Sequence, residues 1–158
     1  MFFPEIREFP GKLLTGIRRR MSFLNDRTSE LWREFRSREG SIEGRIGDES
    51  YSVKVYEPEY SFAKFDPAAE FDKWAAAEMS EQCLGLETLN IPAGEYAMFV
   101  HKGPAAAASV AFGYIFGEWL PNSGHALDQR PHFEVLPKEY DPFDLNAEEE
   151  IWIPVRSR

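Results

Sequence analysis

The sequence has little of several features that would assign a protein to a class at once. Its 158 residues include a single cysteine, Cys83, which excludes an intramolecular disulfide and offers no metal-binding spacing. No apolar run reaches the roughly 18 residues of a membrane span, and no basic-then-apolar leader begins the chain. We therefore expect a cytoplasmic protein with no membrane association.

Positive charge is also scarce. The chain holds 18 Lys and Arg against 27 Asp and Glu, for a formal net charge of −9. A nucleic-acid surface needs a surplus of basic side chains to contact phosphates. The densest basic run, residues 18–20, alternates across a strand and so forms no single basic face. Direct nucleic-acid binding is therefore not expected.

Motifs for common catalytic chemistry are missing as well. There is no GxSxG elbow and no glycine-rich phosphate loop. Three histidines, His101, His125 and His132, are too scattered to predict a metal site, and they do not support haem binding. We expect no metal and no cofactor.

Aromatic residues, in contrast, are abundant. They make up 15% of the chain, with 13 Phe, 6 Tyr and 4 Trp. A single domain of this length buries a sizeable core, which takes up part of this content. The rest leaves room for an aromatic-lined cavity that binds a small molecule.

The first half of the chain predicts a strand, a helix and further strands. Residues 10–22 follow a Pro-Gly turn as a strand, residues 25–40 carry an apolar helical stripe, and residues 51–57 alternate as a strand. Residues 71–80 are open between a helix, favoured by three alanines, and a strand.

The second half predicts the same order. Residues 91–103 follow another turn and are apolar on both faces, as in a strand covered on two sides. Residues 104–124 predict a helix that is apolar nearly all round and therefore largely buried, with Gly113 and Gly117 leaving a smooth stripe for close approach. Two strands follow, residues 130–137 and residues 148–155.

The two halves, roughly residues 10–80 and 87–156, thus share one order of elements. We expect a single α+β domain over residues 1–158, built as a duplicated βαββ repeat with pseudo-twofold symmetry, an antiparallel sheet and two long helices. A groove between the halves is the natural place for a ligand.

Glu134, in the strand "RPHFEVLP", can be interpreted in two ways. Alternation places it on one face with His132 and Leu136. From the residues alone, a solvent-facing glutamate is the better interpretation, because Glu is almost never fully buried unless it is paired.

Several segments together resemble a known family. "GKLLTGIRRRMS", "LWREF" and "YSVKVYE" in the first half, with "IPAGEYAMFVHKG", "FGEWLPNSG", "RPHFEVLP" and "EEEIWIPV" in the second, are similar to AraC-type effector-binding domains, also called gyrase-inhibitory-protein-like. The resemblance implies a hydrophobic ligand groove on the pseudo-twofold axis. It also implies a glutamate in that groove at the position of Glu134.

On this resemblance, Glu134 would be the charge partner of a small amphipathic ligand, which in the family is often cationic. Aromatic side chains would wall the groove and favour a flat cation by stacking. The candidates are Trp152, Tyr114, Tyr56 and Trp74. Leu136 stands where the family usually has an aromatic residue.

The resemblance leaves the activity open among three alternatives. The first is a stand-alone sensor or sequestering protein, since little sequence precedes the first strand to hold a helix-turn-helix unit. The second is a hydrolase of strained, cyclopropane-type rings in which Glu134 is the general base and Glu150 is a second carboxylate at the site. The third is an inhibitor of a protein partner that uses the acidic surface.

Overall fold

The structure is a computed structural model that describes residues 2–40, 44–80 and 85–158. Cys83 lies outside the described residues. The strands are β1 (Glu5–Phe9), β2 (Lys12–Met21), β3 (Ser50–Val55), β4 (Phe71–Glu78), β5 (Glu87–Ile91), β6 (Gly94–Lys102), β7 (His125–Leu127), β8 (His132–Leu136) and β9 (Glu148–Ser157). The main helices are α1 (Thr28–Glu39) and α2 (Ala108–Tyr114).

All the strands pair antiparallel in one sheet, in the order β1-β6-β9-β8-β3-β4-β2-β5, and β7 adds to β9. The predicted α+β class with a large antiparallel sheet is confirmed. The segment left open between helix and strand is strand β4, because it pairs along its length with both β2 and β3. Tertiary pairing thus overrides the helical propensity of its alanines.

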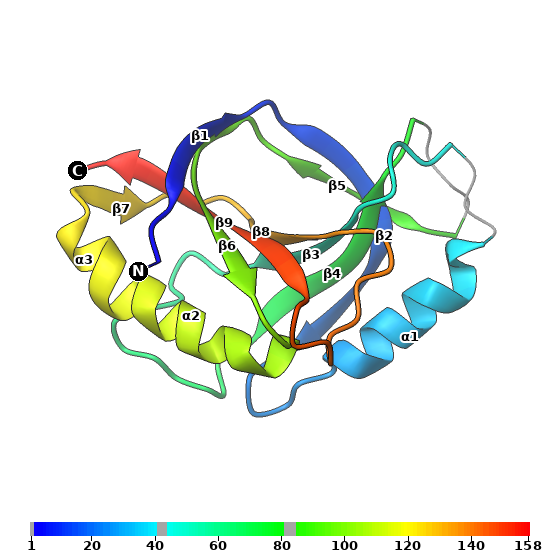
Figure 1. Ribbon diagram of the computed structural model, residues 1–158, viewed down its shortest axis with the longest axis horizontal. Coiled ribbons are helices and arrows are strands. Elements are labelled where there is room, and N and C mark those ends of the chain that lie inside the picture. Colours follow the sequence, from blue (N-terminus) through cyan, green and yellow to red (C-terminus); the bar gives the residue numbers. More distant parts are fainter. Residues whose placement is uncertain (1, 41–43, 81–84) are drawn as a thin grey trace.

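Both long helices lie on the same side of the sheet (Figure 1). Helix α1 covers β2 and β4, where Leu31 and Phe35 are fully buried. Helix α2 and the turn that follows it cover β6 and β9, where Ala111 of α2 and Ile115 of the turn pack in one cluster with Phe99 and Ile151. The central strands β8 and β3 lie between these two packed regions in the sheet order, so the helices flank them and do not cover them directly.

The opposite face of the sheet carries its own apolar core. This core includes the rings of Phe9, Tyr96, Phe133 and Trp152, with Phe133 stacked on Trp152 at 5.4 Å between ring centroids. Because side chains alternate along a strand, each central strand sends one set of residues to this core and the other set toward the helices.

The second helical region is less regular and less buried than expected. It runs continuously from Ala105 to Asn122 through a 3₁₀ turn (Ala105–Ala107), α2, a π turn (Ile115–Trp119) and a last turn, α3 (Leu120–Asn122). Val110 is 77% exposed, so the prediction of a largely buried helix is wrong. Apart from the neighbouring residues and the backbone of the helix itself, no described atom lies within 4 Å of the position that a Cβ would take at Gly113 or Gly117, so no other segment approaches closely there. The sheet covers only one side of this helical region, and the other side faces solvent.

Candidate functional site

A line of side chains on β8 runs between the two helices. His132, Glu134 and Leu136 alternate onto the helix-bearing face, and Glu134 pairs in register with Ser52 of β3 on one side and Ile151 of β9 on the other. Lys54 of β3 lies opposite His132. We call this strip of the sheet, from His132 to Leu136 with the facing part of β3, the seam.

The carboxylate of Glu134 is paired with a lysine of the same chain. Its Oε1 lies 3.5 Å from Nζ of Lys54, and the two side chains are only 16% and 12% exposed. The same ammonium lies 4.4 Å from the ring centroid of Phe112 on α2 and 6.0 Å from that of Phe23. Glu134 is therefore neither free in bulk water nor unpaired.

A second carboxyl group belongs to this cluster. Glu149 of β9 is 4% exposed. Burial raises the pKa of Glu149 to about 8, and the negative charge of Glu134 and a hydrogen bond with Glu134 add to this effect. The Tyr140 hydroxyl donates to Glu149 Oε2 over 3.4 Å. Glu149 is thus largely protonated at neutral pH.

Glu150, the second carboxylate expected from the sequence, lies elsewhere. Its Oε1 accepts a hydrogen bond of 3.1 Å from Nε1 of Trp152, on the other face of the sheet. Because successive strand residues point to opposite faces, the neighbouring Glu149 is the one on the face of Glu134.

A second lysine lies beside the first. Lys73 of β4 is the direct cross-strand neighbour of Lys54, and its ammonium donates to the Thr28 hydroxyl over 2.9 Å. Removal from water, with the nearby charge of Lys54, lowers the pKa of Lys73 to about 8. Like charges directly opposite one another are unfavourable in a sheet.

Aromatic rings close one end of the seam. The ring of Phe62 stacks on Phe116 at 4.4 Å and on His132 at 5.4 Å between centroids. Tyr56 packs edge-on against His132, with 4.9 Å between ring centroids, and at a tilt against Tyr60, with 4.5 Å between centroids. Burial lowers the pKa of His132 to about 3, so the imidazole is neutral and serves as one more flat wall.

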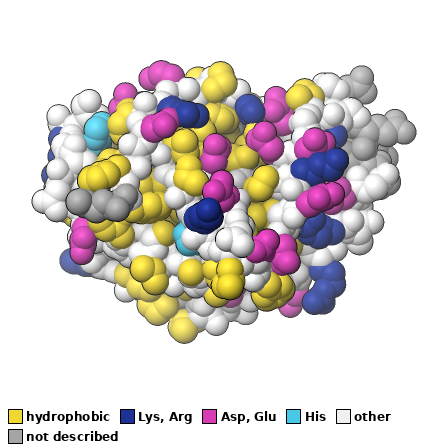
Figure 2. Space-filling view, in the orientation of Figure 1, with side chains coloured by type: hydrophobic (Ala, Val, Ile, Leu, Met, Phe, Trp, Pro, Cys, Tyr) yellow, Lys and Arg dark blue, Asp and Glu magenta, His cyan; other side chains and the backbone are white. Residues whose placement is uncertain are grey.

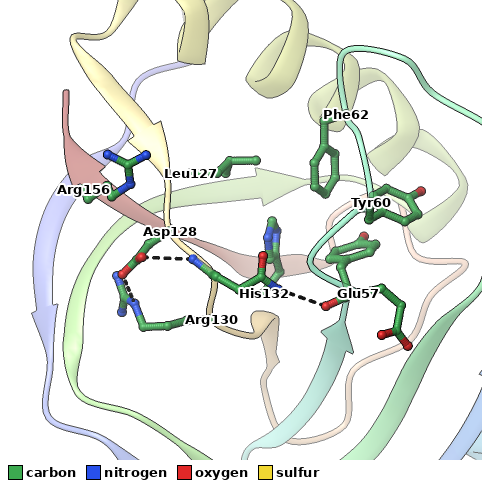
Figure 3. Close-up of a pocket in the computed structure, with 10 residues that line it drawn as sticks. Glu57, Tyr60, Phe62, Leu127, Asp128, Arg130, His132 and Arg156 are labelled. Atoms are coloured by element: carbon green, nitrogen blue, oxygen red, sulfur yellow. Dashed lines mark hydrogen bonds and ion pairs between the residues drawn. The ribbon is translucent and has the colours of Figure 1, made fainter.

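A cavity of about 320 Å³ opens at this aromatic end. Figure 3 shows Tyr60 and Phe62 on one side of it and Arg130 and Arg156 on the other. Its volume is at the lower end of the range for small-molecule sites. The lining residues combine flat rings with a charged rim: Tyr56, Glu57, Tyr60, Phe62, Leu127, Asp128, Gln129, Arg130, His132 and Arg156.

The charged rim is held firmly. Arg130 Nε donates to Asp128 Oδ2 over 2.7 Å, and one of its terminal nitrogens donates to the carbonyl oxygens of Glu95 (2.6 Å) and Val155 (3.2 Å). These bonds tie the segment before β8 to β6 and β9, so the mouth of the cavity is anchored to the sheet.

A second cavity, of about 330 Å³, lies at the other end of the seam, where Leu136 and Tyr140 are among its lining residues. The line His132–Glu134–Leu136 therefore connects two hollows, and the Lys54–Glu134 pair lies between them. Figure 2 shows basic and acidic side chains together near the middle of the visible face, with hydrophobic side chains along its lower rim.

The structure brings together only some of the residues singled out in the sequence. Tyr56 lies near Glu134, whose charge contributes to the raised pKa of that tyrosine after burial. Trp74 and Trp152 belong to the core on the opposite face of the sheet. Tyr114 packs edge-on against Phe2, with 5.9 Å between ring centroids, beside the cluster under α2.

Sequence reasoning missed four members of the site as partners of Glu134 or as ring walls: Lys54, Glu149, Phe62 and Phe112. Alternation along the last strand was a usable signal for Glu149, and the four-residue spacing of Phe112 and Phe116 indicated one helix face. Nothing in the local sequence of Phe62 places it over β8, because it lies in a long connection between β3 and β4.

Two further observations limit the chemistry. Among the described residues, no three His, Cys, Asp or Glu side chains gather closely enough to hold a metal ion. Within the same part of the chain, no helix is long and apolar enough to cross a membrane.

An antiparallel sheet flanked by two helices, with rings and a partly buried carboxylate between them, is an arrangement of an α+β domain that can hold a small molecule. The sequence profile of the GyrI-like small-molecule-binding domain matches residues 2–156. The chain belongs to this family. The resemblance seen in the sequence is thereby confirmed.

The relatives include regulators and ligand-bound domains. The chain is 27% identical over 152 residues to the transcriptional regulator BrlR of Pseudomonas aeruginosa, covering 95% of this chain and 54% of BrlR, so it spans about half the length of that relative.

The fold is similar to that of SAV2435 bound to tetraphenylphosphonium (TM-score 0.73, 12% identity, 97% of this chain and 93% of the other). It is also similar to the EcmrR C-terminal domain (TM-score 0.70, 16% identity, 100% and 99%). A third similar structure is a hydrolase from Listeria innocua (TM-score 0.58, 10% identity, 98% and 92%).

Proposed function

We propose that this protein binds a small amphipathic organic molecule along the seam, with Glu134 as the charge partner of a cationic group. The observation that carries this proposal is the Glu134 carboxylate, 16% exposed, set between two cavities and beside the rings of the helix-bearing face. A carboxylate shielded from water attracts a cation more strongly than one on an open surface. The binding of tetraphenylphosphonium by SAV2435 supports this ligand class.

We further propose that the seam is the junction of two βαββ repeats. The order β2–α1–β3–β4 recurs as β6–α2–β8–β9, with β7 inserted before β8. A pseudo-twofold arrangement would place the two helices on either side of the junction, as Figure 1 has them. Such a protein would act as a sensor or a sequestering protein for its ligand.

The aromatic part of the ligand would occupy the 320 Å³ cavity, against Tyr56, Phe62 and His132. Of the four aromatic residues expected at the site, we therefore assign Tyr56 alone to the ligand wall. Trp74 and Trp152 would support the sheet from its other face, and Tyr114 would support α2.

Thermal unfolding with a planar aromatic monocation tests the proposal. The wild-type protein should be stabilised, by about 2.7 kcal/mol at a ligand concentration of 100 Kd. The Glu134→Gln variant should lose most of this stabilisation, while Glu148→Gln, which removes a 59% exposed carboxylate of β9, should keep it. Equal stabilisation of all three proteins would remove Glu134 from the site.

One observation favours a second candidate function. The raised pKa of Glu149 keeps a protonated carboxyl group beside Glu134, and hydrolysis by general acid–base catalysis uses two such groups. The hydrolase alternative then uses Glu134 as base and Glu149, in place of Glu150, as acid. Turnover of a cyclopropane-bearing substrate should stop in Glu134→Gln, and turnover that persists in this variant would eliminate the mechanism.

A further inference from the structure

Lys54 occupies the place that a cationic ligand would take. Its ammonium lies 3.5 Å from the Glu134 carboxylate and 4.4 Å from the centroid of the Phe112 ring, with Phe23 at 6.0 Å. A carboxylate with aromatic faces around one cation is how proteins recognise organic ammonium groups. Here the cation is part of the chain.

The contact is opposed by a neighbour. Lys73 lies directly across the strand pair from Lys54; its ammonium donates to the Thr28 hydroxyl, and the negative charges of Glu134 and Asp26 also act on it. The attraction of Lys54 to Glu134 is therefore offset in part by repulsion between the two lysines. The net attraction between the Lys54 ammonium and the Glu134 carboxylate is therefore weaker than that of an isolated pair.

The side chain of Lys54 can also move away from Glu134 into solvent. Its side chain keeps 12% of its surface exposed, and a lysine carries its charge on a flexible four-carbon stem. An ammonium that leaves Glu134 can reach water while the stem stays on the apolar surface. A bound cation would then take over both the carboxylate and the ring of Phe112.

We propose that Lys54 is a specificity-determining residue: its ammonium fills the cation subsite at Glu134, so that an organic cation binds only by displacing it. This inference rests on the proposed function. A neutral aromatic molecule of the same shape, bound against Tyr56 and Phe62, has no need to displace the lysine. The protein therefore binds singly charged organic cations more weakly than the presence of Glu134 alone would predict.

The experiment compares two planar tricyclic probes that differ by a charge and one methyl group: N-methylacridinium, which is a permanent cation, and acridine, at a pH where acridine is uncharged. Calorimetry gives the Kd of each probe for the wild-type protein, Lys54→Met, Glu134→Gln and the double variant. Methionine keeps the unbranched shape of the lysine stem without its charge. Lys102→Met is the matched control, since Lys102 forms an exposed pair with Glu148 at 4.0 Å.

We expect Lys54→Met to bind N-methylacridinium at least about tenfold more tightly than the wild type, a change of about 1.4 kcal/mol. Acridine should bind both proteins within about threefold, and Lys102→Met should match the wild type. The gain should vanish in the double variant, because the carboxylate that the freed subsite offers is gone. Should Lys54→Met fold poorly, Lys54→Gln, which removes the charge but keeps a polar group beside Glu134, should show a gain for the cation in the same direction.

A Lys54→Met variant that binds the cation no more tightly than the wild type, while Glu134→Gln still weakens binding, would overturn this inference and leave the proposed function standing. If neither probe binds any of the proteins, both fall. A gain for the cation that survives in the double variant would also overturn it, because the gain would not come from Glu134.

Discussion

Replacing Glu149 by glutamine should change how the stability of the protein depends on pH. Glu149 is 4% exposed, and its pKa is raised to about 8, first by burial and then by Glu134. Above the ordinary glutamate pKa the unfolded chain ionises this group while the folded protein keeps it protonated. The folded state thus binds more protons, and the free energy of unfolding falls as pH rises toward 8.

The size of the effect follows from the width of this window. Each unit of pH between the two pKa values costs about 1.4 kcal/mol of stability for one such group. Between pH 5 and pH 7 the wild type should therefore lose on the order of 2 kcal/mol through the Glu134–Glu149 pair. Glutamine cannot ionise, yet its amide donates to Glu134 as the protonated carboxyl does, so Glu149→Gln should lack this loss.

Urea unfolding at pH 5, 6, 7 and 8 measures the difference directly. Glu149→Gln should gain stability over the wild type as pH rises, while Glu148→Gln, next to it and 59% exposed, should follow the wild type at every pH. A difference between Glu149→Gln and wild type that stays constant across the series would show that folding does not raise the pKa of Glu149, and the reasoning would be refuted.

Two further changes test the scaffold and the ring wall. Gly16→Ala should lower the free energy of unfolding by about 3 kcal/mol in chemical denaturation, because a Cβ there would overlap the carbonyl oxygen of Ala75 on β4; an unchanged midpoint would contradict the close pairing of these strands. Phe62→Ala should cost about 2 kcal/mol and weaken the binding of planar ligands severalfold, since it removes the ring stacked on Phe116 and His132; unaltered affinity by calorimetry would exclude this ring from the ligand wall.

Much of the fold was predictable from local pattern. The strand at residues 10–22, the helix at residues 25–40 and the last two strands all occur where alternation or helical periodicity places them. The errors have common causes. The alanine-rich segment 71–80 is a strand because two partners pair with it, and the apolar helix is half exposed because the sheet covers only one of its sides.

The site was predictable only in part. Alternation put Glu134 on a definite face of its strand, and the family resemblance predicted that this face lines a groove. The pairing of Glu134 with Lys54 depends on the register between β3 and β8, strands about 80 residues apart in the sequence. No local pattern indicates which basic residue lies 3.5 Å from a given carboxylate across two strands.

The sequence by itself determined the α+β class of the domain and the face of the strand on which Glu134 lies, because turn residues, periodicity and strand alternation act within a few residues of each other. Only the tertiary structure decided which side chains contact Glu134. Strand register brought Lys54 and Glu149 to Glu134, and chain folding laid Phe62 over His132. Contacts of this kind depend on the packing of distant segments, so they are set when the sheet and its two helices come together.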